Sequence, residues 1–198
     1  AARCEGVPVA AAIDLIDDGQ VEIAAPQKIG VQGMHLAALH GRIGCRERLT
    51  QHLAGEKLSE MVSLKRAGCI AFSQAKHPIF DTQILLRAMQ YAANFDIAIR
   101  LRPQDHFLAR DGVAHDGEVA SRLGLAGIPV CAETVAIATA LQLANETGVR
   151  LHLARLSSAA GGALVREARR NGLKVTCDVA IHYLHLSEMD IGYFDSQA

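Results

Sequence analysis

The sequence predicts an α/β fold built on a parallel sheet, with a (β/α) barrel favoured over an open doubly wound sheet. Short apolar runs alternate with longer stretches of helical period along the 198 residues, as βα units require. No GxGxxG or GxxxxGK[ST] motif opens a helix, and Gly161-Gly162 is too short a glycine run to replace one. Nucleotide-phosphate binding, the commonest function of an open sheet, therefore has no support, and the barrel leads.

Three strands and one helix are predicted in the first part of the chain. The strands are expected over residues 7–13, 34–39 and 68–73, where apolar residues run together. A helix is expected over residues 58–67, because Leu58, Met61, Val62 and Leu64 recur at helical spacing. Gly68 suits the C-cap of this helix.

Three helices and three strands are predicted to alternate in the second part of the chain. Thr82 is expected to cap a helix that runs to Asn94, and a strand follows over residues 96–101. The next helix covers residues 132–147 and ends at Gly148, and its predicted apolar face consists of Val135, Ala138, Leu141 and Ala144. A strand over 149–154, a helix capped by Ser158 that ends at 171–172, and a strand over 173–179 complete the pattern.

Composition excludes several classes of function. A net charge of −1 provides no electrostatic footprint for nucleic acid or an anionic membrane, and no apolar run approaches the roughly 20 residues that cross a bilayer. The five cysteines are scattered and form no CxxC pair, so we expect reduced thiols and a cytoplasmic location. Because the chain does not begin with Met, we expect it to be part of a longer protein.

Candidate functional residues follow the predicted strands, since the active groups of a parallel barrel lie at the carboxyl ends of its strands. Five segments at or between these ends carry recognisable motifs. They are Phe72-Ser73-Gln74-Ala75-Lys76, Arg102-Pro103-Gln104-Asp105, the run from Gly117 to Pro129 with Ala132-Glu133 after it, His152-Leu153-Ala154-Arg155-Leu156-Ser157, and Ala180-Ile181-His182-Tyr183-Leu184.

These segments resemble, in the same order, the motifs of dihydroorotases of the amidohydrolase superfamily, and the resemblance is clear over residues 54–190. It implies an amidohydrolase-type (β/α)8 barrel, with residues 1–198 forming a single dihydroorotase-like barrel domain. Because such a barrel needs about 250 residues, we expect only part of it to be represented in this chain.

The resemblance also implies a zinc site, and the departures from the family pattern fall on it. Where the family has a carboxylate and two histidines that hold the metal, this chain has Gln74, Arg102 and Arg155. Arginine has no lone pair to donate, and glutamine is a weak ligand for zinc. We therefore expect no metal cofactor and no catalytic residue. Our hypothesis is that the arginines occupy the former metal site opposite carboxylates such as Asp105 or Asp178.

A residual pocket is expected around four other polar residues: Asp105, His152, Asp178 and His182. His152 is interpreted as a structural histidine rather than a ligand, and Asp178 either as a residue that could orient Arg155 or as an ordinary inward-facing polar residue. Glu133 lies near a helix N-terminus, where the helix dipole favours a carboxylate whatever the function.

Three functions remain open from sequence. The first is a metal-less, inactive dihydroorotase-like protein of pyrimidine biosynthesis, for which the resemblance implies an oligomeric assembly with aspartate carbamoyltransferase. The alternative is an active dihydroorotase or other cyclic-amide hydrolase with a non-standard metal site, in which His182 or Asp105 would act as general base. A third, weaker possibility is a module that binds a small anion between Arg102 and Arg155.

Overall fold

The computed structural model describes residues 45–75, 77 and 79–191. The main sheet has five parallel strands: β1 (Cys45–Arg48), β2 (Cys69–Ser73), β3 (Ala98–Leu101), β6 (Arg150–Leu153) and β7 (Val175–Cys177). The helices are α2 (Met61–Arg66), α3 (Thr82–Asn94), α4 (Glu118–Leu123), α5 (Val130–Thr147) and α6 (Ala159–Arg170).

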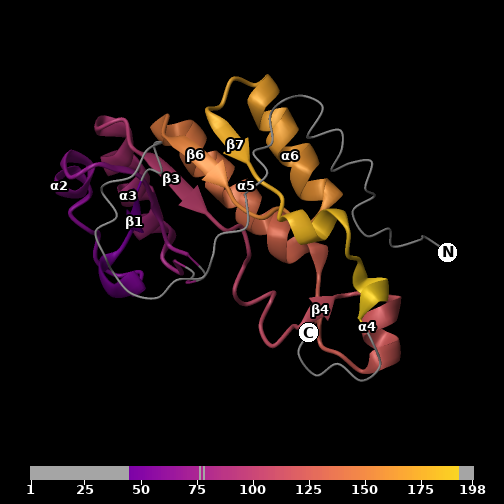
Figure 1. The fold of residues 1–198 in the computed structure, drawn as a ribbon. Coiled ribbons are helices and arrows are strands. Elements are labelled where there is room, and N and C mark those ends of the chain that lie inside the picture. The colour runs from indigo at the N-terminus through magenta and orange to yellow at the C-terminus, as the bar shows by residue number, and fades with distance from the viewer. Residues whose placement is uncertain (1–44, 76, 78, 192–198) are drawn as a thin grey trace, which may run out of the picture.

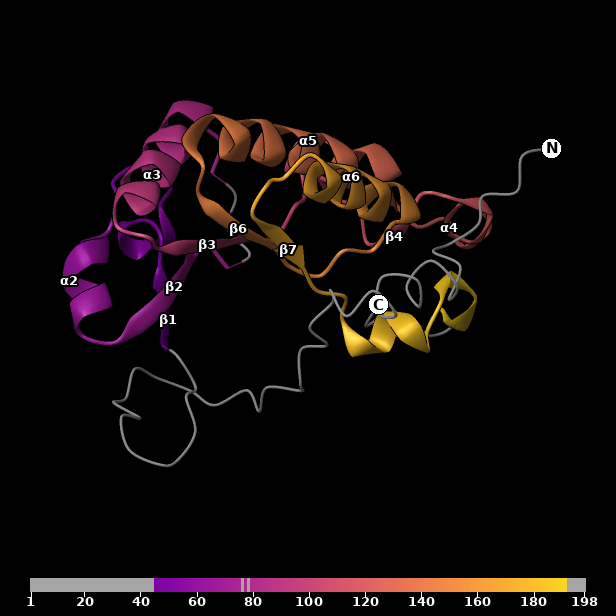
Figure 2. The ribbon, with the colours of Figure 1, turned by 90° about the horizontal axis from the view of Figure 1, so that it is seen from above.

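The order of the strands identifies the sheet as an arc of a barrel. The spatial order β1-β2-β3-β6-β7 follows the chain, and each neighbouring pair is parallel (Figure 1). The long helices α3, α5 and α6 all cover the same face of this sheet (Figure 2). A doubly wound sheet would reverse its strand order and carry helices on both faces. The expected barrel architecture, partly represented, is therefore what the chain forms.

The two faces of the sheet differ in chemistry. Phe72, Ile99, Leu151 and Val175 pair across adjacent strands and lie buried beneath the helices. The residue after each of these points to the opposite face, because side chains alternate along a strand. That second row consists of Ser73, Arg100, His152 and Thr176, which also pair across adjacent strands. The helix-covered face is thus apolar and the other is polar near the carboxyl ends of the strands.

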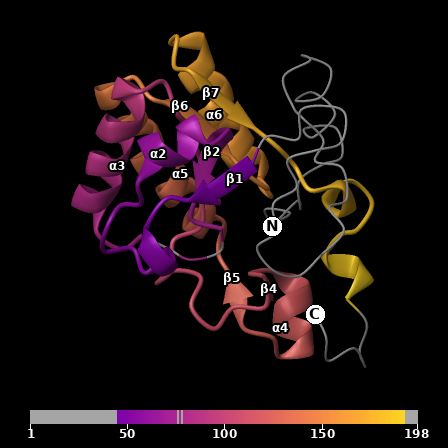
Figure 3. The ribbon, with the colours of Figure 1, turned by 60° about the vertical axis from the view of Figure 1, so that its left-hand side comes forward.

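A short excursion separates β3 from α5. Its strands β4 (Ala114–His115) and β5 (Gly127–Ile128) pair with each other in parallel, and α4 lies between them in the chain. Figure 3 shows this unit beyond the carboxyl end of the main sheet. Gly124 ends α4 with a φ of 69°, a left-handed conformation that glycine adopts without strain.

Most elements in the described residues agree with the sequence prediction, and two details are corrected. The strands at 7–13 and 34–39 lie outside the described residues. Thr82 does not cap α3: the Asp81 carboxylate accepts a hydrogen bond from Gln83 N at 2.7 Å. Val135 and Ala138 are exposed, because α5 is apolar on several sides and buries a face that includes Ile137 and Ala140 instead.

Strand β1, α4 and the β4–β5 pair were not predicted from the sequence. The prediction that Ser158 caps α6 is confirmed, since its hydroxyl accepts a hydrogen bond from Gly161 N at 3.0 Å. In the described part of the chain, no helix is both long and apolar enough to cross a bilayer.

Candidate functional site

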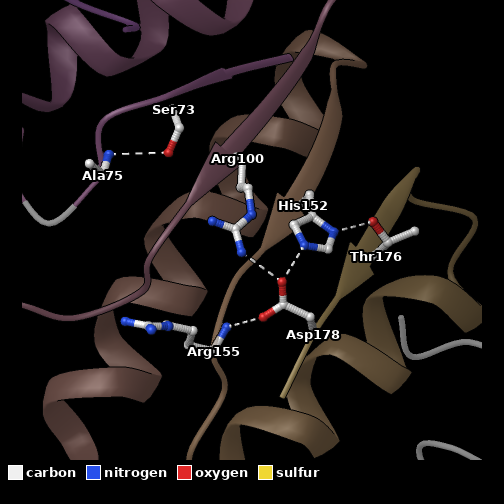
Figure 4. Close-up of polar contacts among 7 residues, drawn as sticks. All are labelled: Ser73, Ala75, Arg100, His152, Arg155, Thr176 and Asp178. Atoms are coloured by element: carbon white, nitrogen blue, oxygen red, sulfur yellow. Dashed lines mark hydrogen bonds and ion pairs between the residues drawn. The ribbon is translucent and has the colours of Figure 1, made fainter. Parts of the chain in front are cut away.

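A polar network joins three strands at the carboxyl end of the sheet. The Asp178 carboxylate, one residue beyond β7, accepts a hydrogen bond from Arg100 Nη2 of β3 at 2.7 Å. One nitrogen of His152, Nε2, lies 3.0 Å from the same Asp178 oxygen, and the other, Nδ1, lies 2.8 Å from Thr176 Oγ1. Figure 4 shows these groups converging on the polar face. The prediction that His152 makes structural hydrogen bonds is confirmed.

The backbone of the β6–α6 connection completes this network. Arg155 N donates a hydrogen bond of 2.6 Å to the second oxygen of Asp178. Arg155 has a φ of 61°, an unusual conformation for a non-glycine residue, and the buried carboxylate holds its N–H in place. Asp178 therefore orients Arg155 through the main chain, while the Arg155 side chain extends away from Asp178 (Figure 4).

The network keeps Asp178 ionised although the residue is only 3% exposed. Burial by itself would raise the pKa of Asp178, but the hydrogen bonds from His152, Arg100 and the Arg155 N–H outweigh burial. Together they hold the pKa of this carboxyl well below its usual range. The guanidinium of Arg100 is its counter-charge, with 22% of that side chain exposed. The buried Nε of Arg100 has no hydrogen-bond partner among the described residues.

These contacts correct the expected pairing of charges. Arg102 and Arg155 were the arginines expected opposite Asp105 or Asp178, and both have exposed side chains without an ion pair in the described part of the chain. The arginine that pairs with a carboxylate here is Arg100. Sequence reasoning missed it because an Arg inside a strand looks like a surface residue, and its partner lies 78 positions away.

Gln74 serves as a structural tie beneath the neighbouring loop. Its side chain is 3% exposed, and its amide nitrogen donates to Thr50 Oγ1 at 2.8 Å and to Leu53 O at 3.0 Å. Its amide oxygen accepts from Thr50 N at 3.3 Å and from Thr50 Oγ1 at 2.9 Å. Both ends of the amide are engaged, so Gln74 fastens the loop after β1 to the end of β2.

The remaining predicted residues do not join this network. Asp105 Oδ1 accepts a hydrogen bond from Leu108 N at 2.9 Å and so shapes its own loop. Arg102, Gln74 and Asp105 line a separate cavity between the β2–α3 and β3–β4 connections. His182 is exposed in the 3₁₀ turn η2 (Ile181–Leu184), with its ring packed edge-on against Tyr183 at a centroid distance of 4.3 Å.

A second buried carboxylate binds the connection between β6 and α6. Glu133, in the first turn of α5, accepts hydrogen bonds from the backbone N–H and the hydroxyl of both Ser157 and Ser158, at 2.5–3.0 Å. It therefore fixes the connection between β6 and α6 that also carries Arg155. The helix-dipole interpretation of Glu133 did not foresee these partners, because they lie 24 and 25 residues further along the chain.

The comparisons with known proteins agree with this architecture. The model of the family described as "Dihydro-orotase-like" matches residues 45–160. The chain belongs to the dihydroorotase-like family. It is 48% identical over 148 residues to a dihydroorotase-like protein of Pseudomonas aeruginosa, covering 75% of this chain and 35% of that protein. It is 38% identical over 167 residues to a dihydroorotase of Syntrophotalea carbinolica, covering 83% and 39% respectively.

The dihydroorotase-like chain thus spans between a third and two fifths of the length of these relatives. Among solved structures, an L-hydantoinase from Arthrobacter aurescens aligns with a TM-score of 0.57 at 21% identity, over 74% of this chain and 34% of that one. A D-hydantoinase aligns with a TM-score of 0.55 at 20% identity, with the same coverage. At these identities the likeness shows the fold, an amidohydrolase barrel of which the chain forms a part.

The zinc implied by the family does not fit the residues at the three matching positions of this dihydroorotase-like chain. The amide of Gln74 is committed to Thr50 and Leu53, and Arg102 and Arg155 are permanent cations without a lone pair. Among the described residues, no three His, Cys, Asp or Glu side chains lie close enough together to hold a metal ion. The three residues at these positions therefore do not form a set of zinc ligands.

Proposed function

We propose that this chain is part of a dihydroorotase-like protein that does not hydrolyse dihydroorotate and instead has a structural role in pyrimidine biosynthesis. The observation that carries the proposal is the engagement of Asp178, whose two oxygens accept from Arg100, His152 and the Arg155 N–H. A carboxylate with three donors and a guanidinium counter-charge is a poor metal ligand and a poor general base.

The substitutions at the three family metal positions support the same proposal. A dihydroorotase of the family type needs a metal to lower the pKa of the attacking water. Two guanidinium groups at ligand positions repel a divalent cation instead of binding it. His152 in the network also has both ring nitrogens engaged, one by Thr176 and one by Asp178, so it is not free to act as a metal ligand.

We further propose aspartate carbamoyltransferase as the partner with which this protein assembles. The support is the family resemblance, together with the intact scaffold around the altered metal positions. Gln74 and Glu133 fix the loops at the carboxyl end of the sheet through eight hydrogen bonds, four between Gln74 and Thr50 or Leu53 and four between Glu133 and Ser157 or Ser158. The Ser158 cap on α6 adds a further hydrogen bond to this region. A rigid, non-reacting surface suits an assembly role.

Two assays on the full chain test these proposals separately. Hydrolysis of dihydroorotate, followed with and without added zinc, should stay at the background rate. Zinc-dependent turnover above the background rate would establish the alternative of an active enzyme. Sedimentation velocity of the chain mixed with the aspartate carbamoyltransferase of the same organism should give a species larger than either component. Independent sedimentation of the two proteins would contradict the partnership.

A further inference from the structure

A cavity of about 430 Å³ lies outside the Asp178 network, between the β2–α3 connection, the β3–β4 connection and helices α3 and α5. Leu101 and Leu153 line it. Each comes directly after a residue that points to the polar face of the sheet, Arg100 or His152, so the two leucines face the helices instead. The cavity therefore opens on the opposite face from the network. Its volume falls in the range of small-molecule sites.

The floor of the cavity is apolar and shaped by small residues. Leu85 of α3 and Leu153 of β6 are buried and line it from two sides. On α5, the lining residues Ala136 and Ala140 carry only a methyl group, and this leaves space that a larger side chain would fill. An apolar body can thus be enclosed there with the usual gain from removing its surface from water.

An aromatic cluster forms one edge of the cavity. The rings of Phe80, His106 and Phe107 contact one another, with centroids 5.0–5.7 Å apart. Phe80 is 59% exposed and Phe107 is 65% exposed, although both also line the cavity. Exposed aromatic side chains gathered at the edge of a pocket are a common feature of ligand sites, because a flat ring can pack against them.

The charged groups of the wall include two guanidinium groups that form no ion pair among the described residues. Arg102 has no hydrogen bond or ion pair in the part of the chain that the structure describes, and Arg110 contacts only the Phe107 ring, with its guanidinium carbon 5.9 Å from the ring centroid. Two carboxylates also line the cavity, Asp105 and Asp111. Asp105 directs one oxygen at Leu108 N, so part of its charge is satisfied by its own loop. Both guanidinium groups remain available for a carboxylate.

We propose that this cavity binds a small organic anion with a flat apolar body, of the class of aryl monocarboxylates. The apolar body lies over the alanines of α5 and against the aromatic edge, and the carboxylate meets Arg102 and Arg110. The cavity shares Gln74 and Arg102 with the family's metal positions, but binding there uses neither the Asp178 network nor a partner protein, so the two proposals can fail separately.

The test is a titration of the full chain with 4-fluorobenzoate, followed by the ¹⁹F line width of the ligand. A ligand of about ten non-hydrogen atoms should bind with a Kd of about 1 mM. Arg102→Gln should weaken binding about tenfold, since it removes a charge-assisted hydrogen bond, whereas Arg87→Gln, an exposed arginine of α3 outside the cavity, should leave the Kd unchanged. The neutral 4-fluorobenzyl alcohol should bind about tenfold more weakly than the acid.

A pair of alanine substitutions on α5 tests the apolar part of the site. Ala136→Phe should abolish binding by filling the cavity, and Ala138→Phe, on the exposed side of the same helix, should not. Circular dichroism shows whether each variant folds, and Arg102→Gln decides the question if Ala136→Phe does not. The proposal is overturned if 4-fluorobenzoate shows no saturable binding, if Arg102→Gln binds like the parent chain, or if the alcohol or inorganic phosphate binds as well as the acid.

Discussion

Replacing Asp178 by asparagine tests the network that links β3, β6 and β7. Asparagine retains the shape of the side chain but removes the charge and one of the two acceptor oxygens. It leaves Arg100 without a counter-charge and confronts the donors with an NH₂ group. Removing one partner of a buried ion pair typically costs about 3–5 kcal/mol. Because the Arg100 side chain is 22% exposed, water recovers some of that loss, and we expect a decrease of about 2–4 kcal/mol in the free energy of unfolding.

The same substitution in an exposed ion pair is the matched control. Asp96 Oδ1 lies 2.9 Å from Arg150 Nε, but these side chains are 79% and 49% exposed. Asp96 has a φ of 48°, a conformation that asparagine also tolerates. Asp96→Asn should therefore cost less than about 1 kcal/mol. Urea denaturation at pH 7 measures both variants, and Asp178→Asn within about 0.5 kcal/mol of the parent chain would refute the structural role of the network.

The pH dependence of the Asp178→Asn effect follows from the lowered pKa. A carboxyl whose pKa is lower in the folded state contributes stability that is fully present above its unfolded pKa of about 3.9 and is lost as the pH falls toward the folded value. The difference between the parent chain and Asp178→Asn should therefore be constant from pH 5 to pH 8 and shrink below pH 4. A difference that grows on acidification would contradict the direction of the pKa shift.

Three further substitutions or labels probe other parts of the fold. Glu133→Ala should lower the free energy of unfolding by about 1–3 kcal/mol in urea, because four partly buried donors lose their acceptor; a loss below about 0.5 kcal/mol would contradict the role of Glu133 in fixing the β6–α6 connection. Gly161→Ala should destabilise by about 1–3 kcal/mol although alanine favours helices, since the added Cβ would meet Glu133 Oε1 and lie 2.8 Å from Ile137 Cδ1; a stabilised variant would contradict that packing. Burial raises the pKa of the Cys177 thiol to about 11, so iodoacetamide at pH 8 should label exposed Cys131 at least about a hundredfold faster, as peptide mapping by mass spectrometry would show; equal rates would contradict the burial.

The sequence predicted the fold best where one physical signal dominated. Helix α3 was expected at its position and with its end at Asn94, because its apolar residues follow a single stripe and its end is marked by the return to a strand. Strand β1 was missed because Cys45-Arg46-Glu47-Arg48 shows no apolar alternation. The buried face of α5 was misassigned because this helix is apolar almost all round, so that helical periodicity did not select one side.

Some of the functional residues could likewise be predicted from the sequence, and others could not. His152 and Asp178 were expected near one another because both lie near the carboxyl ends of strands of the same sheet, and the structure brings them into contact. Arg100 could not be selected from the sequence, since its role depends on the pairing of β3 with β6 and of β6 with β7. His182 matched a family motif but lies in an exposed turn, because a motif does not determine where a loop side chain points.

The central claim is that the family's metal positions no longer bind a metal, and elemental analysis of the purified full chain tests it most directly. The chain should be dialysed against buffer with equimolar zinc and then against metal-free buffer before the measurement. Well under one zinc per chain, unchanged in Asp178→Asn and in Arg102→His, is the predicted result. Near-stoichiometric zinc in the parent chain that falls in Asp178→Asn would show that the carboxyl end of the sheet still holds a metal, and would contradict the claim.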